Sequence, residues 1–550
     1  MEGNLLNQHT SDITNQEVNP LRTESIFCAV CPAKRENLEL RCERGYWQKQ
    51  HLRAIEREEE LKKEIEQLKA RIKYLEKQLY GRKTEKGSKG SESNNKESSA
   101  QDKRRRGHQL GIPGHARRTY SHLPVVEEVY ELAEEEQRCS ICGLPFEEFP
   151  GTEDSEEIEI EVKAYRRRIR RKRYKPGCQC YQLPGIITAK GPAKLIPKSR
   201  LGISVWAMIL LEKYLYQRPI ARLLESLKGY GLDIPQGTVG DGLKRLLALF
   251  EPVGEAIREK SRQEKWWHAD ETRWSVFELP EGKLSHRWYL WVFVSVSTVV
   301  YILNPSRSAE VIKEHLGDVE EGILCVDRYS AYKSFAKSKE GIVLAFCWTH
   351  QRRDFIKVKS SWPGLEAWAG EWVERIGNVF HLNHKRLAHK GSTAGFGEAD
   401  QELRKAIDEM EQMRENELNR EKIDTECLSV LKSLKNHWEG LKVFIDHPHI
   451  PMDNSEAERK IRGPAVGRKN YYGSGSIWSA QLTACLFSVF QTLLKWNINP
   501  RAWLLEYLTV CAEAGGEPPK DISGFLPWKM PEEKRKRMSL NRIRGEPPSP

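Results

Sequence analysis

The sequence predicts a multidomain α+β protein, and three patterns in its 550 residues support this fold class. Apolar residues recur at every third or fourth position from Leu61 to Leu79, which indicates a long amphipathic helix. After Trp266 come several short runs rich in aromatic and β-branched residues, which favour strands. Helical periodicity then dominates residues 365–445. The length leaves room for three or four domains, since a domain usually holds about 100–200 residues.

The composition limits the class of protein further. With 39% hydrophobic and 30% charged residues, the chain has a formal net charge of +11, which suits a soluble protein that meets a polyanion. It contains no run of 18 apolar residues, and its start lacks a basic segment followed by an apolar one. We therefore expect neither membrane insertion nor secretion. The 12 cysteines are clustered, which indicates a reducing cytoplasm and metal-binding thiolates.

A heptad pattern marks the first folded part of the chain. Alternating steps of four and three separate the apolar residues Leu61, Ile65, Leu68, Ile72, Leu75 and Leu79. This spacing predicts a dimerising coiled coil over residues 51–86, after a polar tail over residues 1–50. Because only about three heptads are regular, a single amphipathic helix packed on its own protein is the alternative. Residues 87–125 are rich in Ser, Gly and basic side chains, which predicts a flexible basic linker.

Two cysteine pairs then flank a hairpin-like region. Cys139 and Cys142 form the first pair, and Cys178 and Cys180 form the second. Four thiolates in two close pairs beside a β-hairpin are typical of a structural Zn²⁺ site, so residues 126–195 predict a zinc-ribbon-like module. The single residue between Cys178 and Cys180 leaves two alternatives open, a compressed knuckle or a site that has lost zinc.

The same module carries a strongly basic segment. Its arginines are Arg166, Arg167, Arg168, Arg170, Arg171 and Arg173. In a strand these side chains would project on both faces, and only a partner with many phosphates would neutralise them together. Double-stranded DNA is the natural candidate for this partner.

Residues 196–262 are expected to be helical. The expected helices cover residues 205–216, 219–227 and 238–250, and a glycine turn covers residues 229–231. Thr238 is the expected cap of the last helix, which Gly240 and Gly242 weaken. This order is typical of a helix-turn-helix-like DNA-binding region, whose second helix enters a major groove.

A carboxylate stands at the start of the most strand-like region. Asp270 follows Trp266 and Trp267, and a second apolar run covers residues 288–294. A lone buried carboxylate costs several kcal/mol unless it is paired or bound to a cation. Asp270 therefore either lies at a strand end in solvent or holds something positive.

Asp327 is a second acid of this kind, directly after an apolar strand at residues 322–326. Three strands, a helix at residues 309–316 and then this strand are typical of a ribonuclease-H-like α/β core. Acids on neighbouring strands of such a sheet converge at one edge. Converging carboxylates repel each other unless a divalent cation lies between them, so we expect Mg²⁺ or Mn²⁺ there.

A third acid lies far downstream. Asp453 is expected to cap a helix, and Glu456, three positions later, completes a capping-box pattern. Glu458 is left without such a structural role and projects from a different face of the helix. We therefore expect Glu458 to be the third acid, with Glu456 as the fallback.

The separation between Asp327 and Glu458 is too long for one strand-helix connection, which predicts an α-helical insertion in the core. The expected helices of the insertion cover residues 365–387, 398–418 and 426–445. The expected domains are the first part of the core at 263–359, the insertion at 360–448, the second part of the core at 449–500, and a C-terminal helix with a solvated tail at 501–550.

Four motifs in order carry a family resemblance. They are His-Ala-Asp-Glu-Thr at residues 268–272, Cys-Trp-Thr-His-Gln-Arg-Arg at 347–353, Asp-Asn through Glu-Arg at 453–459, and Arg-Lys-Asn at 468–470. Together they resemble the Insertion Sequence 66 family of bacterial DDE transposases, along nearly the whole chain. The resemblance implies DNA strand cleavage at insertion-sequence ends and strand transfer into target DNA. It places the acidic triad on Asp270, Asp327 and Glu458, which would hold two Mg²⁺ ions.

The resemblance also implies cofactors and partners. It implies a zinc-binding module, although the family usually has two residues where this chain has one between Cys178 and Cys180. The implied partners are the element's terminal repeats, target DNA, a second copy joined through the coiled coil, and accessory transposition proteins. The implied location is the cytoplasm, at the nucleoid when the protein is bound to DNA.

Basic residues near the acids are candidates for phosphate contact. They are His350, Arg352, Arg353, Arg459, Arg462, Arg468 and Lys469. The first three follow an expected strand at residues 343–346 and should emerge near Asp327. The simpler interpretations are a core histidine and solvated helix faces.

Two other classes of protein are compatible with these patterns. The chain could be a DNA-binding protein with an inactive nuclease-like domain, in which case replacing Asp270 leaves DNA binding intact. It could also be a coiled-coil and zinc scaffold, whose DNA binding would be weak and insensitive to salt.

Overall fold

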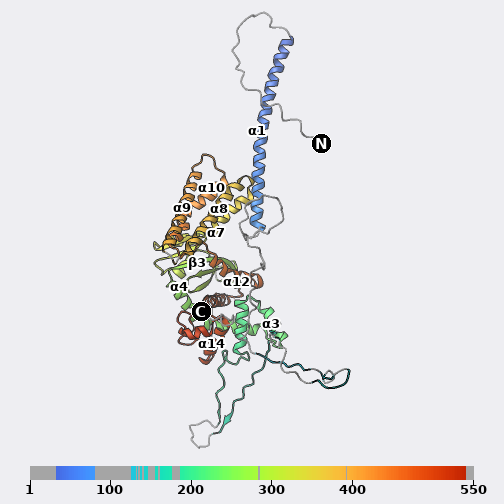
Figure 1. The fold of residues 1–550 in the computed structure, drawn as a ribbon, viewed down its shortest axis with the longest axis vertical. Helices are drawn as coiled ribbons and strands as arrows, with labels where there is room; N and C mark the ends of the chain where they lie inside the picture. The colour runs from blue at the N-terminus through green and yellow to red at the C-terminus, as the bar shows by residue number, and fades with distance from the viewer. Residues whose placement is uncertain are drawn as a thin grey trace. The chain divides into compact units, whose positions relative to one another are not determined.

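The computed structural model describes residues 32–80, pieces between 125 and 175, and residues 186–540 with short gaps. The pieces are 125–131, 133, 137–138, 141–146, 155, 157–158 and 162–175, and the gaps are 281, 283–284, 390 and 392. These residues form two compact units (Figure 1). One unit contains helix α1 and residues 359–366, and the other contains the remaining elements.

Helix α1 covers Pro32–Tyr80. It begins 19 residues before the expected coiled coil at residue 51, so the tail expected over residues 1–50 is helical from Pro32 onward. The heptad positions Leu61, Ile65, Leu68, Ile72 and Leu75 expose between 44% and 56% of their surface. The predicted dimer would cover this apolar seam, and it stays a prediction.

The basic segment forms very little strand. β1 (Arg173–Tyr174) pairs antiparallel with β2 (Ile187–Thr188), on either side of the second cysteine pair rather than between the two pairs, where the hairpin was expected. Residues 162–172 have no regular secondary structure, so the long basic strand expected here is wrong. All six arginines of the segment are exposed.

The predicted zinc ligands fall mostly outside the described residues. Cys139, Cys178 and Cys180 belong to the parts that the structure does not describe, whereas Cys142 is described and exposed. The zinc site therefore stays a prediction.

The helical region contains four elements. They are α2 (Ile203–Leu210), the π-helix η1 (Leu211–Leu215), α3 (Ile220–Gly229) and α4 (Gln236–Arg262). The expected Thr238 cap is wrong, because α4 begins two residues earlier, after Pro235. Gly242 does not weaken α4; a Cβ there would clash with the indole ring of Trp206, so the glycine lets α2 pack closely on α4.

A five-stranded mixed sheet forms the centre of this unit. Its strands are β3 (Trp266–Ser275), β4 (Arg287–Val294), β5 (Val299–Asn304), β6 (Gly322–Val326) and β7 (Ile342–Phe346). Their order is β5-β4-β3-β6-β7, with β4 antiparallel to both of its neighbours and the other pairs parallel. β3 is therefore the central strand.

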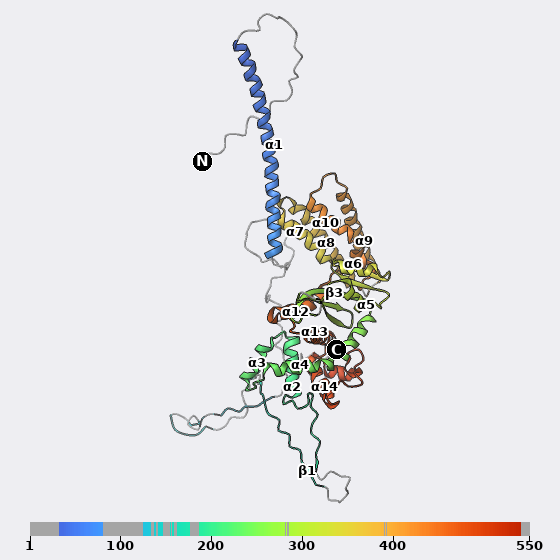
Figure 2. The ribbon, with the colours of Figure 1, turned by 180° about the vertical axis from the view of Figure 1, so that it is seen from behind.

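Helices pack on both faces of the sheet. α12 (Ser455–Tyr471) and α13 (Ile477–Lys495) cover one face, where Tyr301 of β5 donates to the Lys460 carbonyl of α12 and its ring contacts Phe487 of α13. α5 (Ala309–Leu316) and α6 (Ser330–Lys337) contact each other on the other face, where Trp291 of β4 meets Tyr332 of α6 (Figure 2).

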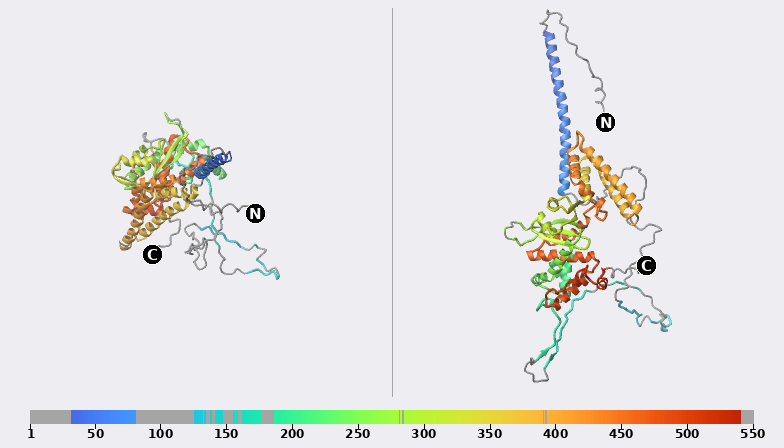
Figure 3. Two further views of the ribbon diagram at one scale, coloured as in Figure 1. Left: turned by 90° about the horizontal axis from the view of Figure 1, so that it is seen from above. Right: turned by 90° about the vertical axis from the view of Figure 1, so that its left-hand side faces the viewer.

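The helical insertion has its own apolar core. Its elements are α7 (Trp348–Ser361), η2 (Pro363–Leu365), α8 (Glu366–Ala388), α9 (Thr393–Leu418), α10 (Thr425–Asn436) and α11 (Trp438–Asp446). Trp372, Leu403 and Leu431, from α8, α9 and α10, are fully buried together. α8, α9 and α10 lie to one side of the sheet and α4 to the other (Figure 3). Helices do occupy the expected region between β7 and α12, but the last expected helix breaks at His437.

The C-terminal part packs back on the fold. It contains α14 (Pro500–Glu513), η3 (Ser523–Phe525) and α15 (Glu532–Arg537). Lys534 and Arg537 of α15 pair with Glu506 of α14 at 2.8 and 2.7 Å, and Met538 is buried. The solvated tail expected after the C-terminal helix is therefore wrong up to residue 540, and residues 541–550 lie outside the described part.

One helix within the described ranges is long and apolar enough to span a membrane. It is α13, and two thirds of its apolar window is buried inside the fold. Because α13 packs against both β5 and α4, its apolar residues belong to the core of the second unit.

Candidate active site at the end of the central strands

Asp270 and Glu271 project from opposite faces of β3, because successive residues of a strand alternate. Asp270 lies opposite Val292 of β4, which in turn pairs with Tyr301, so Asp270 belongs to the face covered by α12 and α13. Glu271 lies opposite Trp291 and belongs to the face covered by α6. Two adjacent carboxylates therefore meet different surroundings.

Asp327 comes to the same end of the sheet as Asp270. β3 and β6 are parallel, and His268 lies beside Cys325. Asp270 follows His268 by two positions, and Asp327 follows Cys325 by two positions. Asp327 Oδ1 accepts a 2.8 Å hydrogen bond from the backbone N–H of Tyr329, which fixes the turn after β6.

Glu458 reaches this place from the first turn of α12. The helix begins at Ser455 with Asn454 as its N-cap, so the expected cap at Asp453 is wrong by one residue. Glu456 does not complete a capping box; it pairs with Arg459 at 2.6 Å and with Lys495 at 3.9 Å. Glu458 lies 3.7 Å from His350 and interacts electrostatically with Asp270. The structure thus places Glu458, rather than Glu456, with the two other acids.

The electrostatics of Asp270 report this convergence. Its pKa is raised to about 8, first by burial and then by the negative charges of Glu271, Asp327 and Glu458. The 2.8 Å hydrogen bond from the Glu271 N–H to Asp270 Oδ1 acts in the opposite direction. A cation at this position would relieve the repulsion.

The donors suit a hard divalent cation, because Mg²⁺ and Mn²⁺ prefer carboxylate oxygens. In the conformation described, however, the side chains do not form a closed ligand cage. Across the described ranges, no group of three or more His, Cys, Asp or Glu side chains is placed to hold a metal ion. The donor chemistry and the mutual repulsion fit the predicted metal, and binding would have to draw the carboxylates closer together.

Glu271 is a buried acid whose role the sequence did not reveal. Its Oε1 accepts from Arg307 Nε and Nη2 at 3.1 and 2.6 Å, and its Oε2 accepts from the Tyr332 hydroxyl at 2.5 Å. Burial raises the pKa of Glu271, while these hydrogen bonds lower it. The Arg307 guanidinium also stacks on Tyr329, 3.9 Å from the ring centre, beside the turn that carries Asp327. The sequence feature that could have indicated this role is the position of Glu271 directly after Asp270 in the strand.

The predicted phosphate contacts divide into two groups. Arg462 and Lys469 on α12 are exposed. Arg459 is exposed but pairs with Glu456, and Arg468 is tied to β3 by a 3.1 Å hydrogen bond to Thr272 Oγ1. Arg468 thus has a structural role in this fold.

The three basic residues on α7 are half-buried. His350 faces Glu458, so this histidine does lie at the acidic site as expected. A buried Arg353 Nε lacks a hydrogen-bond partner among the described residues.

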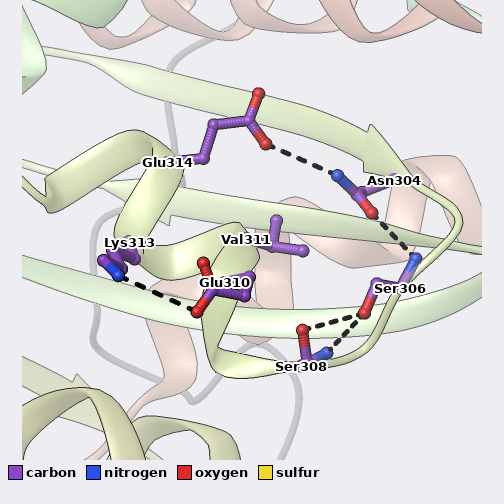
Figure 4. Close-up of a pocket in the computed structure, with 7 residues that line it drawn as sticks. All are labelled: Asn304, Ser306, Ser308, Glu310, Val311, Lys313 and Glu314. Atoms are coloured by element: carbon purple, nitrogen blue, oxygen red, sulfur yellow. Dashed lines mark hydrogen bonds and ion pairs between the residues drawn. The ribbon is translucent and has the colours of Figure 1, made fainter.

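A polar depression elsewhere on the sheet is not this site. It lies at the turn from β5 to α5 and is lined by Asn304, Ser306, Ser308, Glu310, Val311, Lys313 and Glu314 (Figure 4). Its polar groups bond to one another, as in the 2.9 Å contact between the Ser306 and Ser308 hydroxyls. None of the three acids lines it.

A family model identifies the class of protein, the transposases. The model of the Transposase IS66 family matches residues 198–482, just over half of the chain and including all three acids. The chain belongs to this family.

Relatives of similar length are known in Sinorhizobium fredii (strain NBRC 101917 / NGR234). The uncharacterized protein y4jD is 26% identical over 425 residues, covering 74% of this chain and 80% of its own length. The uncharacterized protein y4qI is 26% identical over 424 residues, covering 74% and 76%. Among solved structures, the Mos1 transposase paired-end complex with left transposon end matches 44% of this chain and 78% of its own, with 13% identity and a TM-score of 0.13.

Proposed function

We propose that this transposase cleaves DNA strands at the ends of its insertion sequence and joins those ends to target DNA. The observation that carries the proposal is the convergence of Asp270, Asp327 and Glu458, whose charges raise the pKa of Asp270. The strand order β5-β4-β3-β6-β7, with β4 alone antiparallel within this sheet, supports a ribonuclease-H-like core.

In this proposal, Asp270, Asp327 and Glu458 hold two Mg²⁺ or Mn²⁺ ions. Bound there, such ions activate the attacking oxygen and stabilise the leaving oxygen of an in-line displacement at phosphorus. In cleavage, a water oxygen bonds to the phosphorus while the bond to the 3′ oxygen breaks, which leaves a 3′-OH. In strand transfer, that 3′-OH attacks a target phosphorus and displaces a 3′ oxygen of the target.

The chain's own residues supply positioning and charge. Exposed Arg462 and Lys469 lie on the helix that carries Glu458, where they would bind the phosphates on either side of the reacting one. The arginines at residues 166–173, all exposed, would bind DNA away from the acids. Their number predicts an affinity that falls steeply with salt.

The assembly is part of the same proposal. Two DNA ends require at least two active sites, and the exposed heptad seam of α1 supports a homodimer or larger assembly in the cytoplasm. Zn²⁺ bound by Cys139, Cys142, Cys178 and Cys180 would stabilise the N-terminal DNA-binding module, and accessory transposition proteins would complete the complex.

Cleavage of a DNA fragment that bears the element's own terminal repeats tests the proposal. With Mn²⁺ present, we expect Glu458→Gln to lower the rate by about 1,000-fold or more, as loss of a metal ligand should. Glu456→Gln is the matched control, because Glu456 lies two residues before Glu458 on a different face of the same helix. It should change the rate by less than about threefold. The assignment of the third acid is wrong if Glu456→Gln alone abolishes cleavage. Salt-sensitive DNA binding without any cleavage by the wild type would favour an inactive DNA-binding protein.

A further inference from the structure

A buried hydrogen-bond network links the elements that carry the acids. Its two side chains are His268 and Asn454, which are 4% and 1% exposed. His268 lies two residues before Asp270 on the same face of β3, and Asn454 lies four residues before Glu458, at the start of α12. The network therefore lies within a few residues of two of the three acids.

The hydrogen bonds fix the orientation of both side chains. Asn454 Nδ2 lies 2.7 Å from the Ala269 carbonyl oxygen, which can only accept, so the amide nitrogen must face it. Asn454 Oδ1 then faces His268 Nδ1 at 2.9 Å and can only accept. His268 must therefore carry its proton on Nδ1 to donate this bond.

The backbone of Asn454 extends the network to two more elements. Its N–H points to Cys347 Sγ, at 3.3 Å, just before α7 begins. Its carbonyl accepts from the N–H of Glu458 at 3.2 Å. Each polar group of Asn454 thus has a partner, and together these bonds join β3, the start of α7 and the first turn of α12.

The far end of α12 has its own attachment to β3. Arg468 Nη1 donates to Thr272 Oγ1 at 3.1 Å, and Thr272 lies two residues after Asp270 on the same face. His268, Asp270 and Thr272 therefore face α12 in sequence. Asn454 holds the helix at the end that carries Glu458, and Arg468 holds it at the other end.

We propose that Asn454 is a positioning residue that acts through His268 and Ala269 to hold Glu458 where it can share a divalent cation with Asp270. The inference rests on the proposed function, because it concerns the same acids. The carboxylates are not gathered into a ligand cage in the conformation described. Their approach to a cation therefore depends on how firmly the start of α12 is attached to β3. Loss of a residue that orients a metal ligand usually weakens metal binding about 10- to 100-fold.

Mn²⁺ binding by the full-length protein tests this role without using activity. Free Mn²⁺ would be measured by electron paramagnetic resonance during titration, in the absence of DNA. We expect Asn454→Ala and His268→Leu to raise the half-saturating Mn²⁺ concentration about 10-fold or more. Asn470→Ala is the matched control, because Asn470 lies in the last turn of α12, at the end opposite Glu458. Its side chain donates a 2.9 Å hydrogen bond to the Gln217 carbonyl. This control should shift the concentration by less than about twofold.

A conservative replacement separates positioning from general packing. His268→Asn offers an amide N–H near the position of Nδ1–H, so it should restore Mn²⁺ binding to within about threefold of the wild type, unlike His268→Leu. If Asn454→Ala does not fold, comparison of Mn²⁺ binding by His268→Leu and His268→Asn tests the positioning role. Equal Mn²⁺ affinity in the wild type and the folded Asn454→Ala or His268→Leu variant overturns this inference only. A wild type that binds no Mn²⁺ overturns the proposed function and this inference with it.

Discussion

The two faces of β3 treat neighbouring carboxylates in opposite ways. Glu271, on the α6 face, accepts hydrogen bonds from Arg307 and Tyr332. Asp270, on the α12 face, accepts a backbone N–H bond and otherwise meets the negative charges of Asp327 and Glu458. A buried charge without partners costs a fold more than a paired one, and like charges around it add to this cost unless a cation binds. The contrast is consistent with a structural role for Glu271 and with the metal-binding role that we propose for Asp270.

The helical insertion contains another buried charge that has partners, the guanidinium of Arg386. Arg386 of α8 is fully buried, and its guanidinium donates to Asp400, Asn383 and the carbonyls of Phe444 and Ile445 at 2.7 to 3.0 Å. Its charge is thus paired, as that of Glu271 is, and its buried Nε is the guanidinium nitrogen without a hydrogen-bond partner among the described residues. Asp327 also raises the pKa of Glu271, but Arg307 lies beside Glu271, whereas the charges that act on Asp270 are those of Glu271, Asp327 and Glu458.

The largest expected effect is on catalysis at Asp270. Asp270→Asn should lower the rate of strand cleavage by about 1,000-fold or more, because it removes a metal ligand. The same change should leave metal-free stability equal or higher, since it removes repulsion with Asp327 and Glu458. Single-turnover cleavage and the urea midpoint in the presence of a chelator measure the two effects. A lower midpoint for Asp270→Asn would contradict the contrast.

The second effect concerns the satisfied charge in the insertion. Arg386→Met should destabilise the protein by about 3–5 kcal/mol, because it removes the buried donor to Asp400 Oδ1 and to the carbonyls of Phe444 and Ile445. Arg404→Met is the control: Arg404 pairs with the same Asp400 at 2.7 Å but is exposed, so its loss should cost less than about 1 kcal/mol. Urea denaturation followed by circular dichroism measures both. Equal losses would show that burial does not decide the value of these pairs.

The third expected effect is a loss of stability at low pH caused by the buried histidine His315. The pKa of His315 is lowered to about 3, first by burial and then by the charges of Arg262 and Arg258. Because this folded-state pKa lies below the unfolded value near 6.5, the stability term is complete above pH 6.5 and is lost as the pH falls toward 3. Between pH 7 and pH 5 the loss should be about 2 kcal/mol.

The pH dependence of the urea midpoint measures this term. His315→Gln should have a flatter dependence between pH 7 and pH 5 than the wild type, whatever its stability at pH 7. Exposed His384 provides the control, since His384→Gln should keep the wild-type slope. A wild-type slope in His315→Gln would mean that other groups titrate in this range.

The smallest effect is expected at Glu271. Glu271→Gln keeps the shape of the side chain, but its amide NH2 group would replace one of the two oxygens that accept from Arg307 and Tyr332. The loss of this buried hydrogen bond should cost about 1–2 kcal/mol. Its sign should be opposite to that of Asp270→Asn, although the two residues are adjacent and the substitutions remove one charge each. Chelator-treated protein and urea midpoints allow a direct comparison. A gain in stability at Glu271 would show that its pairing does not offset its burial.

Local patterns predicted much of the fold. The apolar run at residues 322–326 and the helix at residues 309–316 form where expected, because each is specified by side-chain periodicity within a few residues. The insertion was predictable from the separation of Asp327 and Glu458. Expectations that depended on contacts between distant residues were less successful. The need for a glycine at residue 242 comes from the Trp206 ring packed against it, and the ordered position of α15 comes from ion pairs with Glu506.

The candidate site was predictable to a similar degree. Glu458 was chosen because a capping role was assigned to Glu456, yet Glu456 pairs with Arg459 and Lys495 instead. Glu458 lies near His350 and acts on Asp270, whereas the absence of a capping role for Glu456 shows that capping does not distinguish the two acids. Periodicity specifies which face of a helix a residue occupies, but not what lies opposite that face.

The sequence alone determined many of the helices and strands, the order of the acids and the resemblance to the family to which the chain belongs. Tertiary structure decided which acid is paired and which is left among like charges. It also decided that His268 meets Asn454, although they are 186 positions apart. The physical reason is that helix and strand periodicity are local properties, whereas the free energy of a buried charge depends on groups that only folding brings together.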